Sequence, residues 1–365
     1  MNMKTTEKAI LAGVKFFNDP IPLEESMAEL ESLTSTAGAS VVETFVQSRE
    51  KPDGKYFIGT GKAQEILQAV KTLKADIVIF DNELHASQIR NLEELLEVKV
   101  VDRTQLILDI FAQHAGSAEG RLQVGLAQAE FSLTRLSGRG IAMSRLGGGI
   151  GTRGPGETKI EEDRRKIRKN ISMLKKQLEG LRKERHLRRS SRKASGIRTA
   201  TIVGYTNAGK SSLLNAMTRS DVLVENKLFA TLDTTTRKLF LADGGNILIS
   251  DTVGFIQKLP HQLVDAFKAT LDEVTESDIL IHVTDASSPY MEDQITAVYQ
   301  VLEEIGAISK PIITVFNKVD LVDPQDLKTR VMPVAERFSP FALVSATKKT
   351  GLTELKEKMS VSFNG

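Results

Sequence analysis

The sequence predicts an α/β protein whose C-terminal part is a doubly wound, mostly parallel β-sheet. Two observations lead to this prediction. Short β-branched or apolar runs at 198–203, 246–250, 311–316 and 341–344 suit buried parallel strands, and the first is followed by a helix-favouring stretch at 211–217. Strand-like and helix-like segments also alternate through the first 117 residues, which is typical of a second, smaller α/β unit. With 365 residues, 41% of them hydrophobic, the chain is long enough for two or three domains.

The N-terminal domain, placed at 1–117, is predicted to contain four strands and four helices. We expect the strands at 10–16, 40–47, 76–80 and 98–101, and the helices at 23–35, 62–74, 86–97 and 105–115. Because strands and helices alternate, the sheet should be largely parallel.

A helical hairpin is predicted next, at 118–196. Apolar residues recur at steps of four and three in one stretch, and at steps of seven, four and three in a second: Leu122, Leu126, Ala129, Leu133 and Leu136, then Ile160, Ile167, Ile171, Leu174, Leu178 and Leu181. This is the spacing of a helix-to-helix seam, and two such helices joined by a linker form an antiparallel pair. The linker, 137–156, contains eight glycines together with Arg139, Arg145 and Arg153.

The second helix of this hairpin is strongly basic. Residues 157–193 contain fifteen Lys or Arg and six Asp or Glu, a local charge of +9 in a chain whose net charge is only +2. A flexible linker beside a solvated helix would explain the pattern without any partner. The concentration of charge favours RNA instead, with Arg139, Arg145 and Arg153 pairing with phosphates or stacking on bases.

The most informative motif is Gly204-Tyr205-Thr206-Asn207-Ala208-Gly209-Lys210-Ser211, which fits the phosphate-loop pattern G-x-x-x-x-G-K-[ST]. It stands between a predicted strand and a predicted helix. In that position the loop amides and the helix N-terminus point at the phosphates. Lys210 adds a positive charge, and the Ser211 hydroxyl is placed to ligate Mg²⁺.

The nucleotide base is indicated by Asn317-Lys318-Val319-Asp320, which follows the run at 311–316. The Asp320 carboxylate can accept hydrogen bonds from N1–H and the 2-amino group of guanine, whereas adenine has an acceptor at N1. The sequence therefore predicts binding of GTP and GDP.

Two further elements complete the site. Asp251-Thr252-Val253-Gly254 ends the run at 246–250 and fits D-x-x-G, which senses Mg²⁺ and the γ-phosphate. Backbone amides of Ser345-Ala346-Thr347 are placed to reach the guanine O6. A second Mg²⁺ ligand is expected from Thr231, Thr234, Thr235 or Thr236, and composition does not choose among these four.

Together these elements resemble the G domain of the GTPase superfamily, here at 197–365. Phe229-Ala230-Thr231-Leu232-Asp233, Asp251–Ile256 and the glycine-rich stretch 145–159 resemble the HflX GTPases more closely. The resemblance covers nearly the whole chain, favours Thr231 as the Mg²⁺ ligand, and implies binding to the large ribosomal subunit with a role in splitting, rescue or biogenesis. It also implies a nucleotide site built from 204–211 with Ser212, and from 229–233, 251–254, 317–320 and 345–347.

Two residues shape the expected mechanism. Phe255 follows the D-x-x-G glycine, where many GTPases place a glutamine that orients water, so intrinsic hydrolysis should be slow until a partner completes the site. Lys210, Thr231 and Gly254 are the expected catalytic residues. Asn207 resembles the asparagine that holds K⁺ in some GTPases, although it could equally serve only to tolerate an unusual backbone angle.

The chain has no cysteine, and no run approaches the length of a membrane span. We therefore expect a cytoplasmic, monomeric, Mg²⁺-dependent GTPase stimulated by the large ribosomal subunit, without stable membrane association. The alternative is a nucleotide-gated RNA- or ribosome-binding factor in which hydrolysis is incidental.

Overall fold

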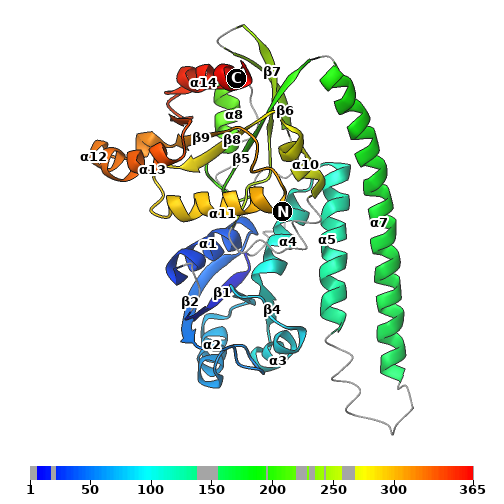
Figure 1. Cartoon of the computed structure of the whole chain (residues 1–365). Helices are drawn as coiled ribbons and strands as arrows, with labels where there is room; N and C mark the ends of the chain where they lie inside the picture. Colours follow the sequence, from blue (N-terminus) through cyan, green and yellow to red (C-terminus); the bar gives the residue numbers. More distant parts are fainter. Residues whose placement is uncertain are drawn as a thin grey trace, which may run out of the picture. The chain divides into compact units, whose positions relative to one another are not determined.

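The computed structural model describes residues 6–17, 22–137, 155–194, 196–218, 228–229, 235–241, 244–256 and 268–364. It divides into two compact units, one made of 1–113 and 121–177 and the other of 114–120 and 178–365. Each unit contains one sheet (Figure 1). The division into three domains at 117 and 196 stays a prediction.

The sheet of the first unit has the strand order β2-β1-β3-β4, and every neighbouring pair is parallel. The strands are β1 Lys8–Phe16, β2 Ser40–Arg49, β3 Ile77–Phe80 and β4 Lys99–Asp102. Four helices alternate with them: α1 Leu23–Thr36, α2 Thr60–Leu73, α3 Ala86–Leu96 and α4 Arg103–His114. All eight elements predicted for 1–117 are confirmed, with shifts of only a few residues at their ends.

A buried ion cluster lies at the carboxyl end of this sheet. Asp81 directly follows β3, and its carboxylate accepts hydrogen bonds from Ser26 Oγ at 2.7 Å and from Arg103 Nη1 at 2.6 Å. Arg103 also pairs with Glu29 of α1. Because Arg103 begins α4, the cluster joins the start of α4 and one face of α1 to the end of β3.

The predicted hairpin is confirmed as two long helices, α5 Ala118–Ser137 and α7 Pro155–Ala194. Their parts within the first unit, 121–137 and 155–177, run side by side in Figure 1. Within the first unit, Leu174 is buried opposite Gly125, and Lys175 Nζ lies 2.8 Å from a carboxylate oxygen of Glu130. The linker arginines Arg139, Arg145 and Arg153 lie outside the described residues, so their predicted contacts with RNA stay predictions.

The sheet of the second unit has the order β10-β9-β8-β5-β7-β6, with only the β6–β7 pair antiparallel. Its strands are β5 Arg198–Gly204, β6 Thr235–Phe240, β7 Asn246–Asp251, β8 Ile279–Asp285, β9 Ile312–Asn317 and β10 Phe341–Leu343. The doubly wound, mostly parallel sheet is therefore confirmed. Strand order reverses direction at β5, so the loop after β5 opens at the switch point where such folds bind ligands.

Helices cover this second sheet. They are α8 Lys210–Thr218, α10 Lys268–Glu276, α11 Met291–Glu304, α12 Pro324–Asp326, α13 Met332–Arg337 and α14 Leu352–Asn364, with the short turns η2 Val319–Leu321 and η3 Leu327–Val331. The core between strands and helices consists of buried aliphatic residues such as Ile202, Leu213, Ile281, Val315 and Leu355. Among the described residues, no helix is both long and apolar enough to cross a membrane.

Candidate nucleotide-binding site

The predicted motifs meet at the carboxyl edge of the second sheet. The phosphate loop follows β5, Asp251 is the last residue of β7, and Asn317 is the last residue of β9. The 345–347 segment follows β10. Parallel strands point their carboxyl ends in one direction, so four segments that are far apart in the sequence converge on one site.

The phosphate loop has the backbone that its glycine and asparagine predict. Asn207 has a left-handed φ of 59° and is exposed, which fits the interpretation that it tolerates this turn. Gly209 has φ 90°, and a Cβ there would stand 2.3 Å from the side-chain Nδ2 of Asn317. Only glycine therefore satisfies both the angle and the space at position 209.

Lys210 is the buried cation of the site, with a residue exposure of 7%. Its Nζ donates hydrogen bonds to the carbonyl oxygens of Gly204 at 3.1 Å and Tyr205 at 2.8 Å. Burial lowers the pKa of Lys210 to about 8, and the nearby Asp251 carboxylate acts in the opposite direction. The ammonium is held beside the loop, where an anion would restore the stability of its charged form.

A pair of oxygen ligands lies next to this lysine. Ser211 Oγ, in the first turn of α8, donates to Asp251 Oδ2 at 2.6 Å, and Asp251 is fully buried. Thr252 is fixed by its own hydroxyl, which donates to the Ile202 carbonyl at 2.8 Å. A hydroxyl in the first turn of a helix and a carboxylate at the end of a strand are hard oxygen donors, and they fit Mg²⁺ held together with substrate phosphates.

The segment after D-x-x-G is hydrogen-bonded to the phosphate loop. Phe255 N donates to Gly204 O at 3.0 Å, and Thr206 N donates to Phe255 O at 2.7 Å. The Phe255 side chain is buried, at 3% exposure. Gly254 lies so close that a Cβ there would stand 2.9 Å from Lys210 Nζ. The D-x-x-G glycine is thus beside the lysine, and Phe255 packs in the core as expected for a resting state.

Asn317 joins two loops of the site. Its Nδ2 donates to the Ala208 carbonyl at 2.9 Å, and its Oδ1 accepts from the Ala346 amide at 3.1 Å. Asn317 is 2% exposed. The structure therefore shows it holding the phosphate loop against the 345–347 segment, while its predicted contact with guanine stays a prediction.

The two charged residues of the N-K-x-D motif differ in their contacts. Lys318 has a left-handed φ of 62°, and its Nζ lies 2.7 Å from Asp285 Oδ2 at the end of β8. Asp320 is exposed in η2, and within the described part of the chain its carboxylate has no hydrogen-bond or ion-pair partner. Its acceptor oxygens are therefore available to a base.

The switch segment is described only in part. Phe229 is buried, with φ 56°, whereas Ala230, Thr231, Leu232 and Asp233 lie outside the described residues, as does Thr234. Thr235 and Thr236 belong to β6, and Thr236 Oγ1 lies 2.9 Å from Ser250 Oγ. These two threonines are strand residues here, and the prediction that Thr231 binds Mg²⁺ stays a prediction.

One site residue was not anticipated from the sequence. Asp285 ends β8 and accepts hydrogen bonds from the amide and hydroxyl of Ser287, at 3.0 and 2.6 Å, in addition to pairing with Lys318. The sequence does carry a signal, because Asp285 is the first acidic residue after the mostly aliphatic stretch 279–284, which includes His282 and Thr284. A carboxylate at the end of a buried strand is the same pattern that identified Asp251.

A doubly wound sheet with a phosphate loop, D-x-x-G and N-K-x-D at its carboxyl edge defines a GTP-binding protein of the P-loop GTPase class. Three family models match: "GTP-binding GTPase N-terminal" at 24–112, "GTP-binding GTPase Middle Region" at 114–192 and "50S ribosome-binding GTPase" at 199–318.

Relatives cover almost the entire chain. The chain is 50% identical over 351 residues to GTPase HflX of Caldanaerobacter subterraneus, covering 96% of this chain and 79% of that protein. It is 46% identical over 365 residues to GTPase HflX of Alkalihalophilus pseudofirmus, covering 100% and 85%. A crystal structure of a GTP-binding protein from Sulfolobus solfataricus in complex with GDP matches 98% of each chain, with 27% identity and a TM-score of 0.51. The chain belongs to the HflX family of GTPases, and it is a GTP hydrolase.

Proposed function

We propose that this GTPase depends on Mg²⁺, binds the large ribosomal subunit and hydrolyses GTP rapidly only when that subunit stimulates it. The observation that carries this proposal is the state of Phe255. Its backbone is hydrogen-bonded to the phosphate loop, and its side chain is buried.

The residues divide the work of hydrolysis between positioning and charge stabilisation. Lys210 and the loop amides hold the phosphates, and Gly254 offers its amide to the γ-phosphate. Ser211, Thr231 and Asp251 would hold Mg²⁺, which neutralises charge on the phosphate oxygens when bound. Asp320 accepts from the guanine edge, with Asn317 and Lys318 holding the surrounding loops.

No glutamine stands at position 255 to orient the attacking water. A phenyl ring has neither donor nor acceptor for a water molecule, and in this structure the ring is buried. Slow intrinsic turnover follows, and a partner that releases Phe255 from the phosphate loop would open the place that the water needs.

Support for an RNA partner comes from α7. This helix carries the basic run 157–193, leads through 195–197 into β5, and so connects directly to the phosphate loop. Within the second unit, Arg182 Nε lies 3.1 Å from Asp272 Oδ2 of α10, the helix that follows the D-x-x-G segment. A partner bound along α7 would therefore act on the helix that leads into β5 and, through Arg182, on α10. The family model named for 50S ribosome binding favours the large subunit as that partner.

Turnover of GTP, measured with and without purified large subunits, tests the proposal. We expect slow turnover by the protein alone and a strong increase with subunits. Rapid turnover without any partner, left unchanged in Phe255→Ala, would show the proposal to be wrong.

The competing function is a nucleotide-gated ribosome-binding factor in which hydrolysis is incidental. The same assay separates the two, because such a factor would bind subunits more tightly with GTP than with GDP yet show no stimulated turnover. A cytoplasmic, monomeric protein acting in ribosome splitting, rescue or biogenesis is the setting that the family resemblance favours.

A potassium ion held by Asn207 would add positive charge beside the phosphates in place of an arginine. The left-handed φ of Asn207 explains the residue without K⁺. Equal turnover in KCl and NaCl would exclude the potassium role, and faster turnover in KCl would support it.

A further inference from the structure

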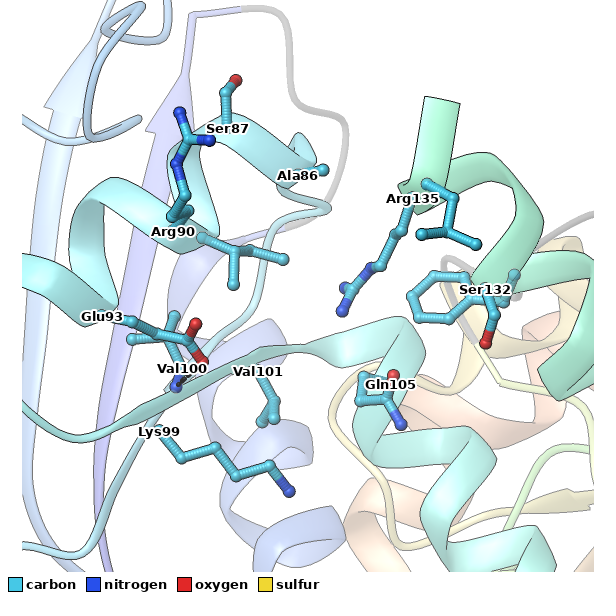
Figure 2. Close-up of a pocket in the computed structure, with 13 residues that line it drawn as sticks. Ala86, Ser87, Arg90, Glu93, Lys99, Val100, Val101, Gln105, Ser132 and Arg135 are labelled. Carbon is cyan, nitrogen blue, oxygen red and sulfur yellow. Dashed lines mark hydrogen bonds between the residues drawn. The ribbon is translucent and has the colours of Figure 1, made fainter. Parts of the chain in front are cut away.

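A cavity of about 510 Å³ lies in the first unit (Figure 2). Its walls come from α3, from β4, from the first turn of α4 and from the last turns of α5. The volume is within the range of roughly 300–1,000 Å³ that is usual for small-ligand sites. β4 is an edge strand of its sheet, so the cavity lies along an edge that no other described strand covers.

The charged residues that line the cavity are mostly basic. Arg90, Lys99 and Arg135 are the basic residues of the lining, and Glu93 is its one acid. The Glu93 carboxylate is turned to the strand edge, where it accepts the Val100 amide at 3.3 Å. Lys99 is exposed, and among the described residues Arg90 makes only a long ion pair with Glu94, at 3.8 Å, so both cations can meet an anion without first breaking a strong contact.

Arg135 has a different role because it is held rigidly. Its Nη2 lies 2.7 Å from Asp102 Oδ2, and its guanidinium lies over the Phe131 ring at 4.1 Å from the ring centre. Asp102 is itself fixed by the amides of Leu84 and Gln105, at 3.2 and 2.9 Å. In Figure 2, Arg135 reaches from α5 toward β4. A guanidinium fixed on one face presents its other face as a flat, charged platform on which a base can stack.

Polar side chains complete the lining. Ser87, Gln105 and Ser132 offer donors and acceptors from three different helices, and Ile89 and Val101 supply apolar contact. Cations for a phosphate, a stacking plane and adaptable hydrogen-bond groups are the combination with which proteins hold single, unstacked nucleotides of RNA.

We propose that this cavity binds one unstacked nucleotide of the RNA partner, with the base against Arg135 and the phosphate on Lys99 and Arg90. The inference rests on the proposed binding to the large subunit and deepens it. In the sequence, α5 leads from this cavity directly into the glycine- and arginine-rich linker that is predicted to contact RNA.

The absence of cysteine from the sequence allows a direct test. A single thiol from Ser132→Cys, placed at the rim of the cavity, is labelled with a photo-reactive azide and bound to purified large subunits. The matched control is Ser32→Cys, an exposed position on α1 that is not part of the cavity. We expect illumination to attach ribosomal RNA to the Ser132→Cys protein, at one defined region, and not to the control.

Charge reversal provides an independent measurement. Lys99→Glu should weaken binding to the large subunit about tenfold or more, and Lys71→Glu, an equal change on the exposed face of α2, should leave it nearly unchanged. Circular dichroism melting of each variant separates a loss of contact from a loss of fold.

Each outcome decides the matter. Cross-links to a ribosomal protein alone, or none from a variant that still binds subunits, would overturn the nucleotide site. Equal loss of binding in Lys99→Glu and Lys71→Glu would do the same. Free GMP or AMP that prevents the RNA cross-link at low concentration would assign the cavity to a free nucleotide. A wild-type protein that binds no subunits at all would instead contradict the proposed function.

Discussion

Lys210 is a charged group buried in the protein before any phosphate arrives, and this has a consequence for pH. Burial lowers its pKa in the free protein to about 8, and bound phosphates raise it again. Below about pH 8 the ammonium is already present. Above that pH, binding must first take up a proton, so GDP affinity should be flat near about pH 7 and fall by up to roughly tenfold per pH unit above about 8.

Titration calorimetry across this range measures the effect, with Lys210→Arg as the control. The guanidinium stays charged, so the affinity of this variant, although lower, should lack the fall above about pH 8. Both proteins share the titration of the nucleotide itself, and their difference isolates Lys210. Parallel curves would contradict the depressed pKa.

Asp320 is the residue on which base choice depends. Two hydrogen bonds to its carboxylate contribute about 1.5–3 kcal/mol each, so Asp320→Asn should weaken GDP binding about a hundredfold or more. Xanthine has a carbonyl where guanine has the 2-amino group, and the asparagine amide can donate to it. The variant should therefore prefer XDP, whereas Asp326→Asn, also exposed and six residues away, should keep the preference for GDP. Competition binding decides, and a retained GDP preference in Asp320→Asn would show that another group reads the base.

At the scale of elements, the phosphate loop is sensitive to single atoms. Gly209→Ala would place a methyl group 2.3 Å from the Asn317 amide, which ties this loop to 345–347, at a φ of 90°. We expect loss of measurable GDP binding and a stability cost of about 1–3 kcal/mol. Gly306→Ala is the matched control, because Gly306 has φ 72° but nothing within 4 Å of the added carbon. The Gly306→Ala change should lower the free energy of unfolding by about 1–2 kcal/mol and leave GDP affinity unchanged. Denaturant unfolding measures the stability of both variants, and a fluorescence titration measures their GDP affinity. Together they distinguish backbone strain, which both variants share, from the steric clash with Asn317, which only Gly209→Ala has.

Elements with a strong local pattern were predictable. β1 and β3 are short apolar runs, and the α5–α7 hairpin follows from its heptad spacing, so these elements appear at the expected positions. β8 was not predicted. Its residues 279–284 are buried, but the polar residues His282 and Thr284 interrupt its apolar pattern. The contacts that assemble the site join residues that are far apart in the sequence, and no local pattern predicts them. Ala208 and Asn317 are 109 residues apart, and only the fold shows that the asparagine joins them.

The same limit applies to the buried ions of the first unit. Arg103 follows β4 and carries a charge, which in a sequence favours an exposed surface, yet it is 3% exposed and pairs with Asp81 and Glu29. Its partners come from a strand end and a helix far upstream. Pairing decides whether a charge can be buried, and pairing is a property of the three-dimensional structure.

For the whole molecule, the uneven charge predicts how binding responds to salt. The local charge of +9 in 157–193 belongs to α7, where Lys169 and Lys176 are both exposed. If these side chains neutralise RNA phosphates, the logarithm of affinity for large subunits should fall linearly with the logarithm of salt concentration. Replacing both with Glu should weaken binding and reduce that slope by about 2, because each lost phosphate contact removes about one unit.

The control keeps the same change in net charge but moves it off α7. Lys71→Glu on α2 combined with Lys328→Glu in η3 alters two exposed cations that lie outside the basic run. Long-range attraction depends on net charge, so any general effect would weaken both double variants equally and leave their slopes alike. Sedimentation of the protein with large subunits at several salt concentrations gives the slopes. A reduced slope only in the α7 variant would locate the phosphate contacts on that helix, and equal slopes in all three proteins would contradict a role for α7 in binding RNA.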